Sequence, residues 1–151
     1  MGSDTINLRH MTICLTAEQQ LAVCRYFSDS GFAVDPRTLA NGNWPNSTQP
    51  WYCYANMDDL HWGVDSNDLF TVFFAFGFEA STPRNSTTIT SVSYTGDYDD
   101  AKWLWDHIAQ ALPALDGYIE WAAEGGTRFR WIFKDGVVTE ITPRLVWEND
   151  A

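Results

Sequence analysis

The sequence predicts a single α+β domain over residues 1–151, in which a mostly antiparallel sheet is packed by two helices. Three observations favour this fold class. A chain of 151 residues can bury a substantial core without disulfides or metals. Two segments place apolar residues at helical spacing, between segments that alternate or are continuously apolar. The end of the chain holds three apolar stretches joined by glycine-containing turns, which is typical of an antiparallel meander. The predicted order is β-α-(long loop)-β-β-α-β-β-β.

The first strand and the first helix are expected near the start of the chain. Residues 6–15 have the pattern of a strand, with Met11, Ile13 and Leu15 on one side. Thr16 should cap the helix, because Gln19 stands in the capping-box position. The inward stripe of this helix is expected to consist of Ala17, Leu21, Cys24 and either Phe27 or Ser28.

The middle of the chain begins with a long loop. Residues 35–50 are rich in Pro, Asn, Gly and Thr, and loops of this length often carry function. Short aromatic segments follow at 51–54 and 60–63. The nearly continuous apolar run at 69–79 is typical of a central strand covered on both faces.

A polar turn and a β-branched strand at 87–94 lead to the second helix. Asp97 should cap this helix, with Asp99 and Asp100 favourably placed in its first turn. A proline should end the helix near Leu112. The residues at helical spacing are Ala101, Leu104, Trp105, Ile108, Ala111, Leu112 and Leu115.

Three strands are expected in the C-terminal meander, at 118–123, 127–133 and 137–147. Three-residue loops at 124–126 and 134–136 are predicted to join them. A two-residue turn in the second hairpin would place Trp131 opposite Glu140 and mix apolar with polar side chains, whereas the longer loop keeps them apart.

This register predicts one buried face and one charged face. The opposite face lines up Glu120, Arg130 and Glu140 as a row of alternating charge. Pro143 cannot donate a backbone hydrogen bond, so the last strand should be an edge from there on. The buried face is expected to hold Ile119, Trp121, Phe129, Trp131, Phe133, Val137 and Ile141.

The net charge of −11 argues against direct binding of nucleic acid or of an anionic membrane. It permits a basic protein partner. The charge is uneven, because residues 38–101 contain eight acids and one cation and so hold −7 of the total. If these acids share one side of the molecule, they make a surface that could steer a basic partner.

The candidate binding residues lie in this acidic segment. Three tryptophans could anchor a partner at its edges. Each part of this surface also has a structural alternative. The whole surface could be a solvated face above an aromatic core. The aspartates between residues 58 and 68 could form turns, and those between 97 and 100 could cap a helix. The candidates are Trp44, Trp51, Asp58, Asp59, Trp62, Asp65, Asp68, Asp97, Asp99 and Asp100.

No catalytic residue, metal site or cofactor is predicted. His10-Met11-Thr12 matches the H-x-T motif of two-histidine phosphoesterases, but the second such motif is missing. The aspartates near residue 60 do not have the spacing of an EF-hand. Three cysteines (Cys14, Cys24 and Cys53) without C-x-x-C spacing predict reduced, buried thiols. With no signal-peptide core and no apolar run of membrane-spanning length, we expect a cytoplasmic protein.

Several short motifs recur in an order that resembles small actinobacterial and phage proteins of unknown function. The resemblance implies an α+β fold and cytoplasmic residence, in the host if the protein is phage-encoded, and it implies no activity. The motifs are Leu15-Thr16-Ala17-Glu18, Pro50-Trp51-Tyr52-Cys53, Leu60-His61-Trp62-Gly63, Trp103-Leu104 and the segment from Gly117 to Trp121 with the turns after it.

The leading hypothesis is a small, non-enzymatic binding protein, of phage or mobile-element origin, that blocks a basic, nucleic-acid-binding host defence protein. The alternative is a protein that binds a small molecule or nucleotide in an aromatic pocket with the Asp cluster. A third hypothesis is a homo-oligomer formed through the C-terminal edge strand.

Overall fold

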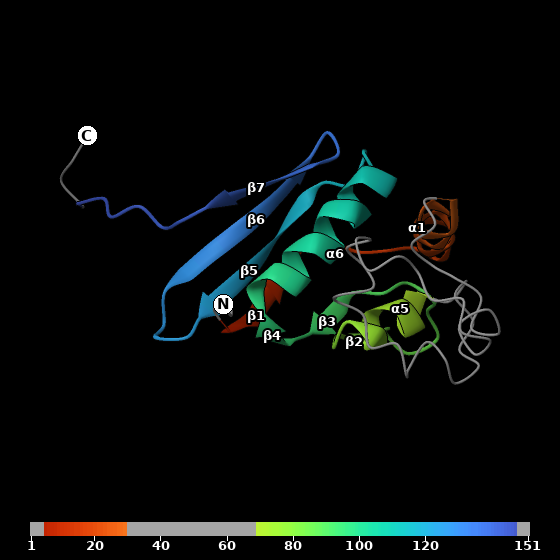
Figure 1. Cartoon of the computed structure of the whole chain (residues 1–151), viewed down its shortest axis with the longest axis horizontal. Coiled ribbons are helices and arrows are strands. Elements are labelled where there is room, and N and C mark those ends of the chain that lie inside the picture. Colours follow the sequence, from red (N-terminus) through yellow and green to blue (C-terminus); the bar gives the residue numbers. More distant parts are fainter. Residues whose placement is uncertain (1–4, 30–68, 148–151) are drawn as a thin grey trace, which may run out of the picture.

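The computed structural model describes residues 5–29 and 69–147. These residues form an α+β fold with a five-stranded and a two-stranded antiparallel sheet (Figure 1). The predicted loop at 35–50 and the aromatic segments at 51–54 and 60–63 lie outside the described residues. None of the helices in the described part is long and apolar enough to cross a membrane.

The larger sheet has the strand order β4-β1-β5-β6-β7. Its strands are β1 (Thr5–Met11), β4 (Thr95–Asp97), β5 (Gly117–Ala123), β6 (Arg128–Lys134) and β7 (Val137–Ile141). The edges of this sheet are therefore β4 and β7.

The smaller sheet pairs β2 (Glu79–Ser81) with β3 (Ser91–Ser93). The strands predicted at 6–15 and 87–94 are shorter than expected. Beyond β1 and before β3, only a single bridge joins Leu15 to Ile89. Met11, Ile13 and Leu15 nevertheless face inward as predicted.

The helix α1 (Ala17–Asp29) begins at the predicted capping box. The Thr16 N–H donates to Gln19 Oε1 at 2.9 Å, and the Gln19 N–H donates to Thr16 Oγ1 at 3.2 Å. The predicted stripe is wrong in part, because Leu21 is 48% exposed and Ala17 is also exposed. The buried side chains are those of Val23, Cys24 and Phe27. Cys14, expected to be buried, is exposed.

The segment predicted as a central strand is a helix, α5 (Leu69–Ala75). Its buried side chains, with that of Phe76 just after it, follow helical spacing: Leu69, Val72, Phe73 and Phe76. Phe74, which strand alternation would place with Val72 and Phe76, is 56% exposed. An apolar run of this length has no period that separates a buried strand from a buried helix. Gly77, at φ +89°, then turns the chain into β2.

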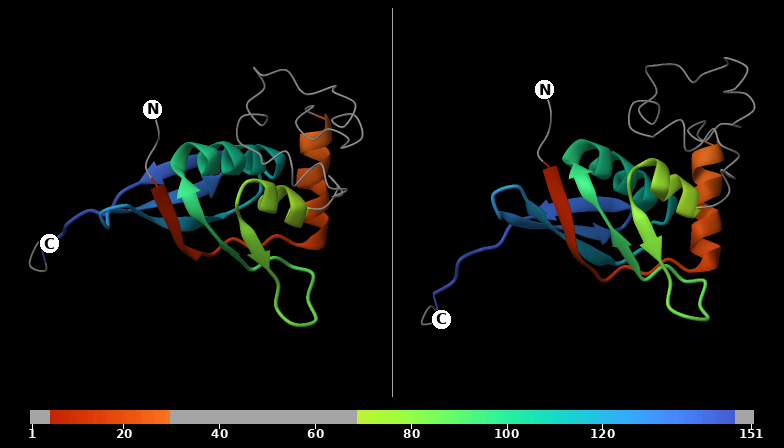
Figure 2. Two further views of the ribbon diagram at one scale, coloured as in Figure 1. Left: turned by 60° about the horizontal axis from the view of Figure 1, so that its bottom comes forward. Right: turned by 90° about the horizontal axis from the view of Figure 1, so that it is seen from below.

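The helix α6 (Tyr98–Ala111) is the predicted second helix, capped by Asp97 and followed by the C-cap Leu112. Its inward stripe matches the prediction and adds Ala109. Figure 2 shows α6 along one side of the five-stranded sheet, with no described helix on the other side. The ring of Trp105 packs edge-on against Phe133, with 5.7 Å between centroids. The core therefore lies between α6 and one sheet face, with α1 and α5 at its end.

The first hairpin of the meander has the predicted register. Ala123 donates to the Thr127 carbonyl at 2.7 Å across the three-residue loop. Glu120 lies opposite Arg130, as expected. Ile119, Trp121, Phe129, Trp131 and Phe133 form the buried face.

The second hairpin has the two-residue turn that the sequence argued against. Lys134 pairs with Val137 and Trp131 with Glu140, and both Asp135 (φ +53°) and Gly136 (φ +77°) adopt left-handed backbone. This is the geometry that Asp-Gly favours in a tight hairpin. Relative to the prediction, β7 is turned over, so the predicted burial of Val137 and Ile141 and the place of Glu140 in the charged row are wrong.

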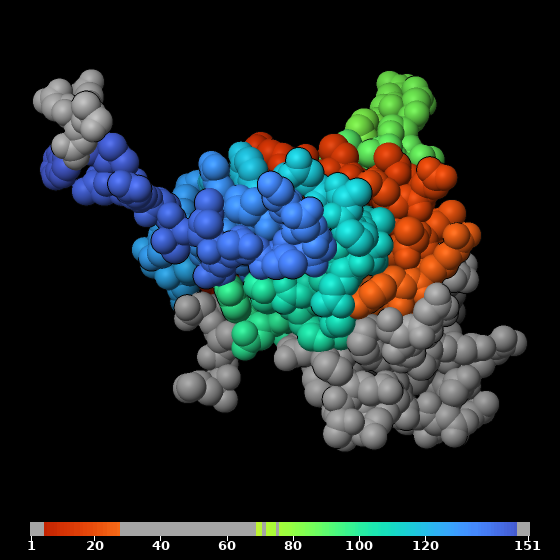
Figure 3. Space-filling model, turned by 90° about the horizontal axis from the view of Figure 1, so that it is seen from above, coloured from red at the N-terminus to blue at the C-terminus, as the bar shows by residue number. Residues whose placement is uncertain are grey.

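The last strand is also shorter than predicted. The chain leaves the sheet after Ile141, and residues 142–147 project from the body without regular structure (Figure 3). Leu145, Val146 and Trp147 in this segment are 81%, 62% and 69% exposed.

Candidate functional site

Three of the ten predicted site residues can be placed: Asp97, Asp99 and Asp100. The other seven, Trp44, Trp51, Asp58, Asp59, Trp62, Asp65 and Asp68, lie outside the described residues. The structure brings the three aspartates together at the junction between β4 and α6.

The carboxylate of Asp97 is engaged in capping α6. Its Oδ1 accepts from the backbone N–H of Asp99 at 2.9 Å and of Asp100 at 3.4 Å. These two N–H groups have no partner within the helix, so the cap satisfies them. The helix-cap reading of these residues is therefore confirmed for Asp97.

Asp100 is the aspartate of this group whose pKa is raised. Burial raises its carboxyl pKa from 3.8 to about 6, with further contributions from the charges of Asp97 and Asp99. Burial and the charges of Asp100 and Asp97 also raise the pKa of Tyr94, whose hydroxyl donates to the Asp97 carbonyl at 2.9 Å. Three carboxylates thus crowd one helix start, and ionising all of them is unfavourable.

Metal binding finds no support in the residues that the structure describes. Among them, no group of three or more His, Cys, Asp or Glu side chains could hold a metal ion. Further along α6, the Lys102 ammonium pairs with Asp106 at 2.7 Å.

His107 has a structural role between α6 and α1. The Tyr26 hydroxyl donates to Gln110 Oε1 at 2.8 Å and lies 2.8 Å from His107 Nδ1. Since the hydroxyl has one proton, His107 Nδ1–H must donate to the Tyr26 oxygen. Burial lowers the pKa of His107, which favours this neutral form at pH 7.

His10, the candidate from the H-x-T motif, is exposed on β1. Its ring lies 5.7 Å from that of Tyr118. The Thr12 hydroxyl oxygen accepts from the Tyr118 backbone N–H at 2.9 Å. The motif's side chains therefore serve strand packing, and no second histidine of the described chain joins them.

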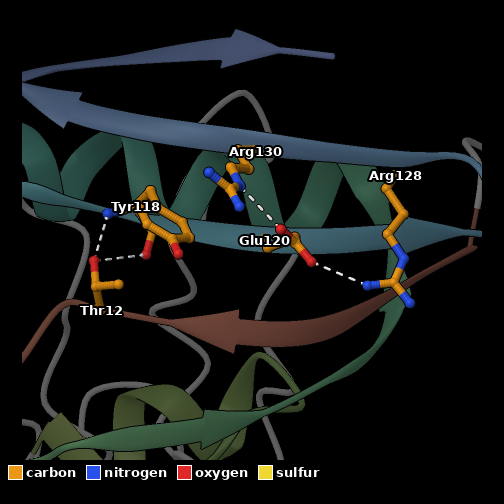
Figure 4. A network of polar contacts seen from close by, with 5 residues as sticks. All are labelled: Thr12, Tyr118, Glu120, Arg128 and Arg130. Atoms are coloured by element: carbon orange, nitrogen blue, oxygen red, sulfur yellow. Dashed lines mark hydrogen bonds and ion pairs between the residues drawn. The ribbon is translucent and has the colours of Figure 1, made fainter. Parts of the chain in front are cut away.

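The sheet face that no described helix covers carries a charged row, which the predicted register had partly hidden. His10, Glu120, Arg130 and Ile141 lie opposite one another across β1, β5, β6 and β7. Figure 4 looks onto this face, with α6 behind the strands. Glu140, expected in the row, is absent from it because β7 is turned over.

Two arginines hold Glu120 from either side (Figure 4). Arg130 Nε donates to Glu120 Oε1 at 2.9 Å, and Arg128 Nη1 donates to Glu120 Oε2 at 3.0 Å. The bond from Arg130, followed by that from Arg128, holds the pKa of Glu120 below its usual value. The guanidinium carbon of Arg130 also lies 4.3 Å from the centre of the Tyr118 ring, a cation–π contact.

These residues form one side of an open groove of about 410 Å³, lined by Glu120, residues 128–130 and residues 141–144. We call it the arginine groove, after Arg128, Arg130 and Arg144. The clustering of four of the nine cations at 128–144 was a signal for it in the sequence.

A second open groove, of about 510 Å³, lies between α1, α5 and the β2–β3 loop. Its lining includes Leu21 and Phe70 and no acidic, basic, histidine or cysteine side chain. The hydroxyl groups of Thr82, Ser86 and Thr87 also line it.

Comparison with known proteins gives no family for this chain. No family model matches it, and neither a curated protein nor a solved structure matches it. The resemblance to actinobacterial and phage proteins therefore stays a prediction.

Proposed function

We propose that this chain is a small, non-enzymatic binding protein whose acidic segment, residues 38–101, binds a basic protein. The supporting observation is the gathering of Asp97, Asp99 and Asp100 at the start of α6, where burial, with the charges of Asp97 and Asp99 added to it, raises the pKa of Asp100 to about 6. In the free protein the ionised carboxylates repel one another. A cation of a basic partner placed beside them would reduce this repulsion, and this reduction would favour binding.

The class of partner follows from this charge. A protein that binds nucleic acid presents a basic surface, and an acidic protein that covers this surface would inhibit it. Inhibition of a host nucleic-acid-binding protein, as a phage or mobile element would require, is the biological role that we propose.

A labelled lysine-rich peptide tests the acidic surface, with fluorescence anisotropy as the readout. The double variant Asp99→Asn/Asp100→Asn keeps the Asp97 cap and should weaken binding roughly tenfold, as expected for two lost charge contacts. Asp116→Asn/Glu124→Gln removes the same charge from exposed acids outside the segment, and should change the affinity less than about twofold.

Equal weakening by the two double variants would contradict the proposal, because the peptide would then sense only net charge. Absence of binding to the wild-type protein at low salt would contradict it as well. If the proposal holds, the bound peptide should also lower the pKa of Asp100.

A further inference from the structure

The sheet face opposite α6 concentrates positive charge in a protein that is strongly acidic overall. Arg128, Arg130 and Arg144 surround a single carboxylate, that of Glu120, in the arginine groove. We propose that this groove binds a short acidic peptide segment of another protein, in extended conformation along β7.

The arginines have hydrogen-bonding capacity beyond what Glu120 uses. A guanidinium group has five N–H donors, and Arg128 and Arg130 are each seen to direct one nitrogen at Glu120. Their side chains are still 49% and 46% exposed. Arg144 is exposed and forms no ion pair with any residue in the described ranges. A carboxylate entering the groove can therefore meet free donors from three guanidinium groups.

The pair with Glu120 fixes the direction of two of these arginines before any ligand arrives. Arg130 is held between the Glu120 carboxylate and the Tyr118 ring. Less side-chain entropy is then lost on binding than for arginines that move freely.

The neighbouring strand suits an extended peptide. β7 is the edge of the sheet and pairs only with β6 among the described strands. An added strand would find unpaired backbone groups there. Val137 and Ile141 offer apolar contacts, being 59% and 46% exposed on the same face as the arginines. The groove supplies the cationic contacts and Ile141, and the adjoining strand β7 supplies Val137 and the backbone edge.

These contacts favour a peptide over nucleic acid. At long range, the net charge of −11 repels a nucleic acid, with a charge on every phosphate, more strongly than it repels a short acidic segment. A short acidic segment needs only the arginines of the groove as its partners. A peptide backbone can also pair with the backbone N–H and C=O groups at the edge of β7, whereas a sugar–phosphate backbone cannot.

The probe is a fluorescent ten-residue peptide of alternating glutamate and valine. It is compared with the same peptide carrying glutamine in place of glutamate, and with a single-stranded oligonucleotide of equal length. The glutamate peptide should bind the wild-type protein roughly tenfold more tightly than either, and should bind more weakly as salt rises.

Arg144→Gln and Arg128→Gln should each weaken binding of the glutamate peptide severalfold, by roughly 3–10-fold. Arg144 lies in a segment without regular structure, so its substitution leaves the fold intact. Arg84→Gln is the matched control, since Arg84 is an exposed cation in the β2–β3 loop, and its effect should be less than about twofold.

Tighter binding of the oligonucleotide would overturn the proposal in favour of a nucleic-acid site. Equal loss on Arg84→Gln and Arg144→Gln, or no preference for glutamate over glutamine, would also overturn it. The groove lies on the sheet face opposite α6, so Asp99→Asn/Asp100→Asn should leave acidic-peptide binding intact. Failure here and failure of the proposed function are therefore distinguishable.

Discussion

The indole of Trp131 donates a hydrogen bond of 2.9 Å to Oε1 of Glu140 on the neighbouring strand. The same oxygen accepts from the hydroxyl of Tyr98, on α6, at 2.6 Å. Trp131 is fully buried, whereas Glu140 lies on the edge strand and reaches solvent. A carboxylate can therefore stand opposite a core tryptophan, because it satisfies two polar groups at the rim of the core.

Glu140→Ala should lower the free energy of unfolding by about 1–3 kcal/mol, because it leaves the buried Trp131 N–H without an acceptor. Glu140→Gln retains an acceptor oxygen and should cost less. Thr139→Ala, at the next position and on the opposite face, is the control and should cost no more than about 0.5 kcal/mol. Urea unfolding measures all three. Equal effects of the alanine variants would contradict the hydrogen-bonded role of Glu140.

The Asp135-Gly136 turn predicts opposite effects for two substitutions at one position. Asp135→Gly should be neutral or slightly stabilising, because glycine accepts a positive φ freely. Asp135→Val should destabilise the protein by about 1–2 kcal/mol, because a β-branched residue is strained there. In a three-residue loop Asp135 would have ordinary backbone, so a destabilising glycine and a harmless valine in thermal melts would argue for that loop.

The helical state of α5 predicts unequal effects for two adjacent phenylalanines. Phe73 is fully buried, and the centroid of its ring lies 5.5 Å from that of Trp105. Phe73→Ala should therefore cost about 3–5 kcal/mol. Phe74 is 56% exposed, and Phe74→Ala should cost less than about 1 kcal/mol. Similar losses for the two variants in chemical denaturation would fit a strand buried on both faces instead.

The pH dependence of stability should carry a contribution from Asp100. Folding raises its pKa from 3.8 to about 6, so between these values the folded state holds a proton that the unfolded state releases. The stabilisation is fully present below pH 3.8 and is lost as the pH rises through about 6.

Asp100→Asn should remove this loss. Relative to the wild-type protein it should gain stability as the pH rises from 4 to 7, by about 1 kcal/mol after allowance for solvent screening. Asp116→Asn is the control and should show no such gain. Denaturant unfolding at several pH values measures the difference, and a variant that tracks the wild-type protein at every pH would contradict the raised pKa of Asp100.

The sequence predicted those elements in which local signals agree. At α6 the Asp97 cap, the acidic first turn, the apolar spacing and Pro113 all indicate one helix, and the structure confirms it. At 69–79 the only signal was continuous apolarity, which suits a buried helix as well as a buried strand. Packing of this segment against α1 and the core selects the helix, and a single sequence does not reveal such tertiary contacts.

The error in the second hairpin also concealed the arginine groove. The predicted register placed Glu140 beside Arg130, so the charges on that face nearly balanced. A slip of one residue moves every side chain of β7 to the other face, and the observed register sends Glu140 to Trp131 and Tyr98. Among the described acids, only Glu120 then pairs with Arg128 and Arg130. The excess of positive charge on this sheet face therefore becomes evident only when the pairing of β6 with β7 is known.

We propose two binding surfaces of opposite charge, one beside the start of α6 and the other on the sheet face opposite α6. Amide chemical-shift mapping on the ¹⁵N-labelled protein, with the lysine-rich and the glutamate–valine peptides added in turn, tests this proposal most directly. The lysine-rich peptide should shift amides at 98–101, and the acidic peptide should shift those at 128–130 and 137–144. Shifts from both peptides in one common set of residues, or no shifts at 128–130 with the acidic peptide, would contradict it.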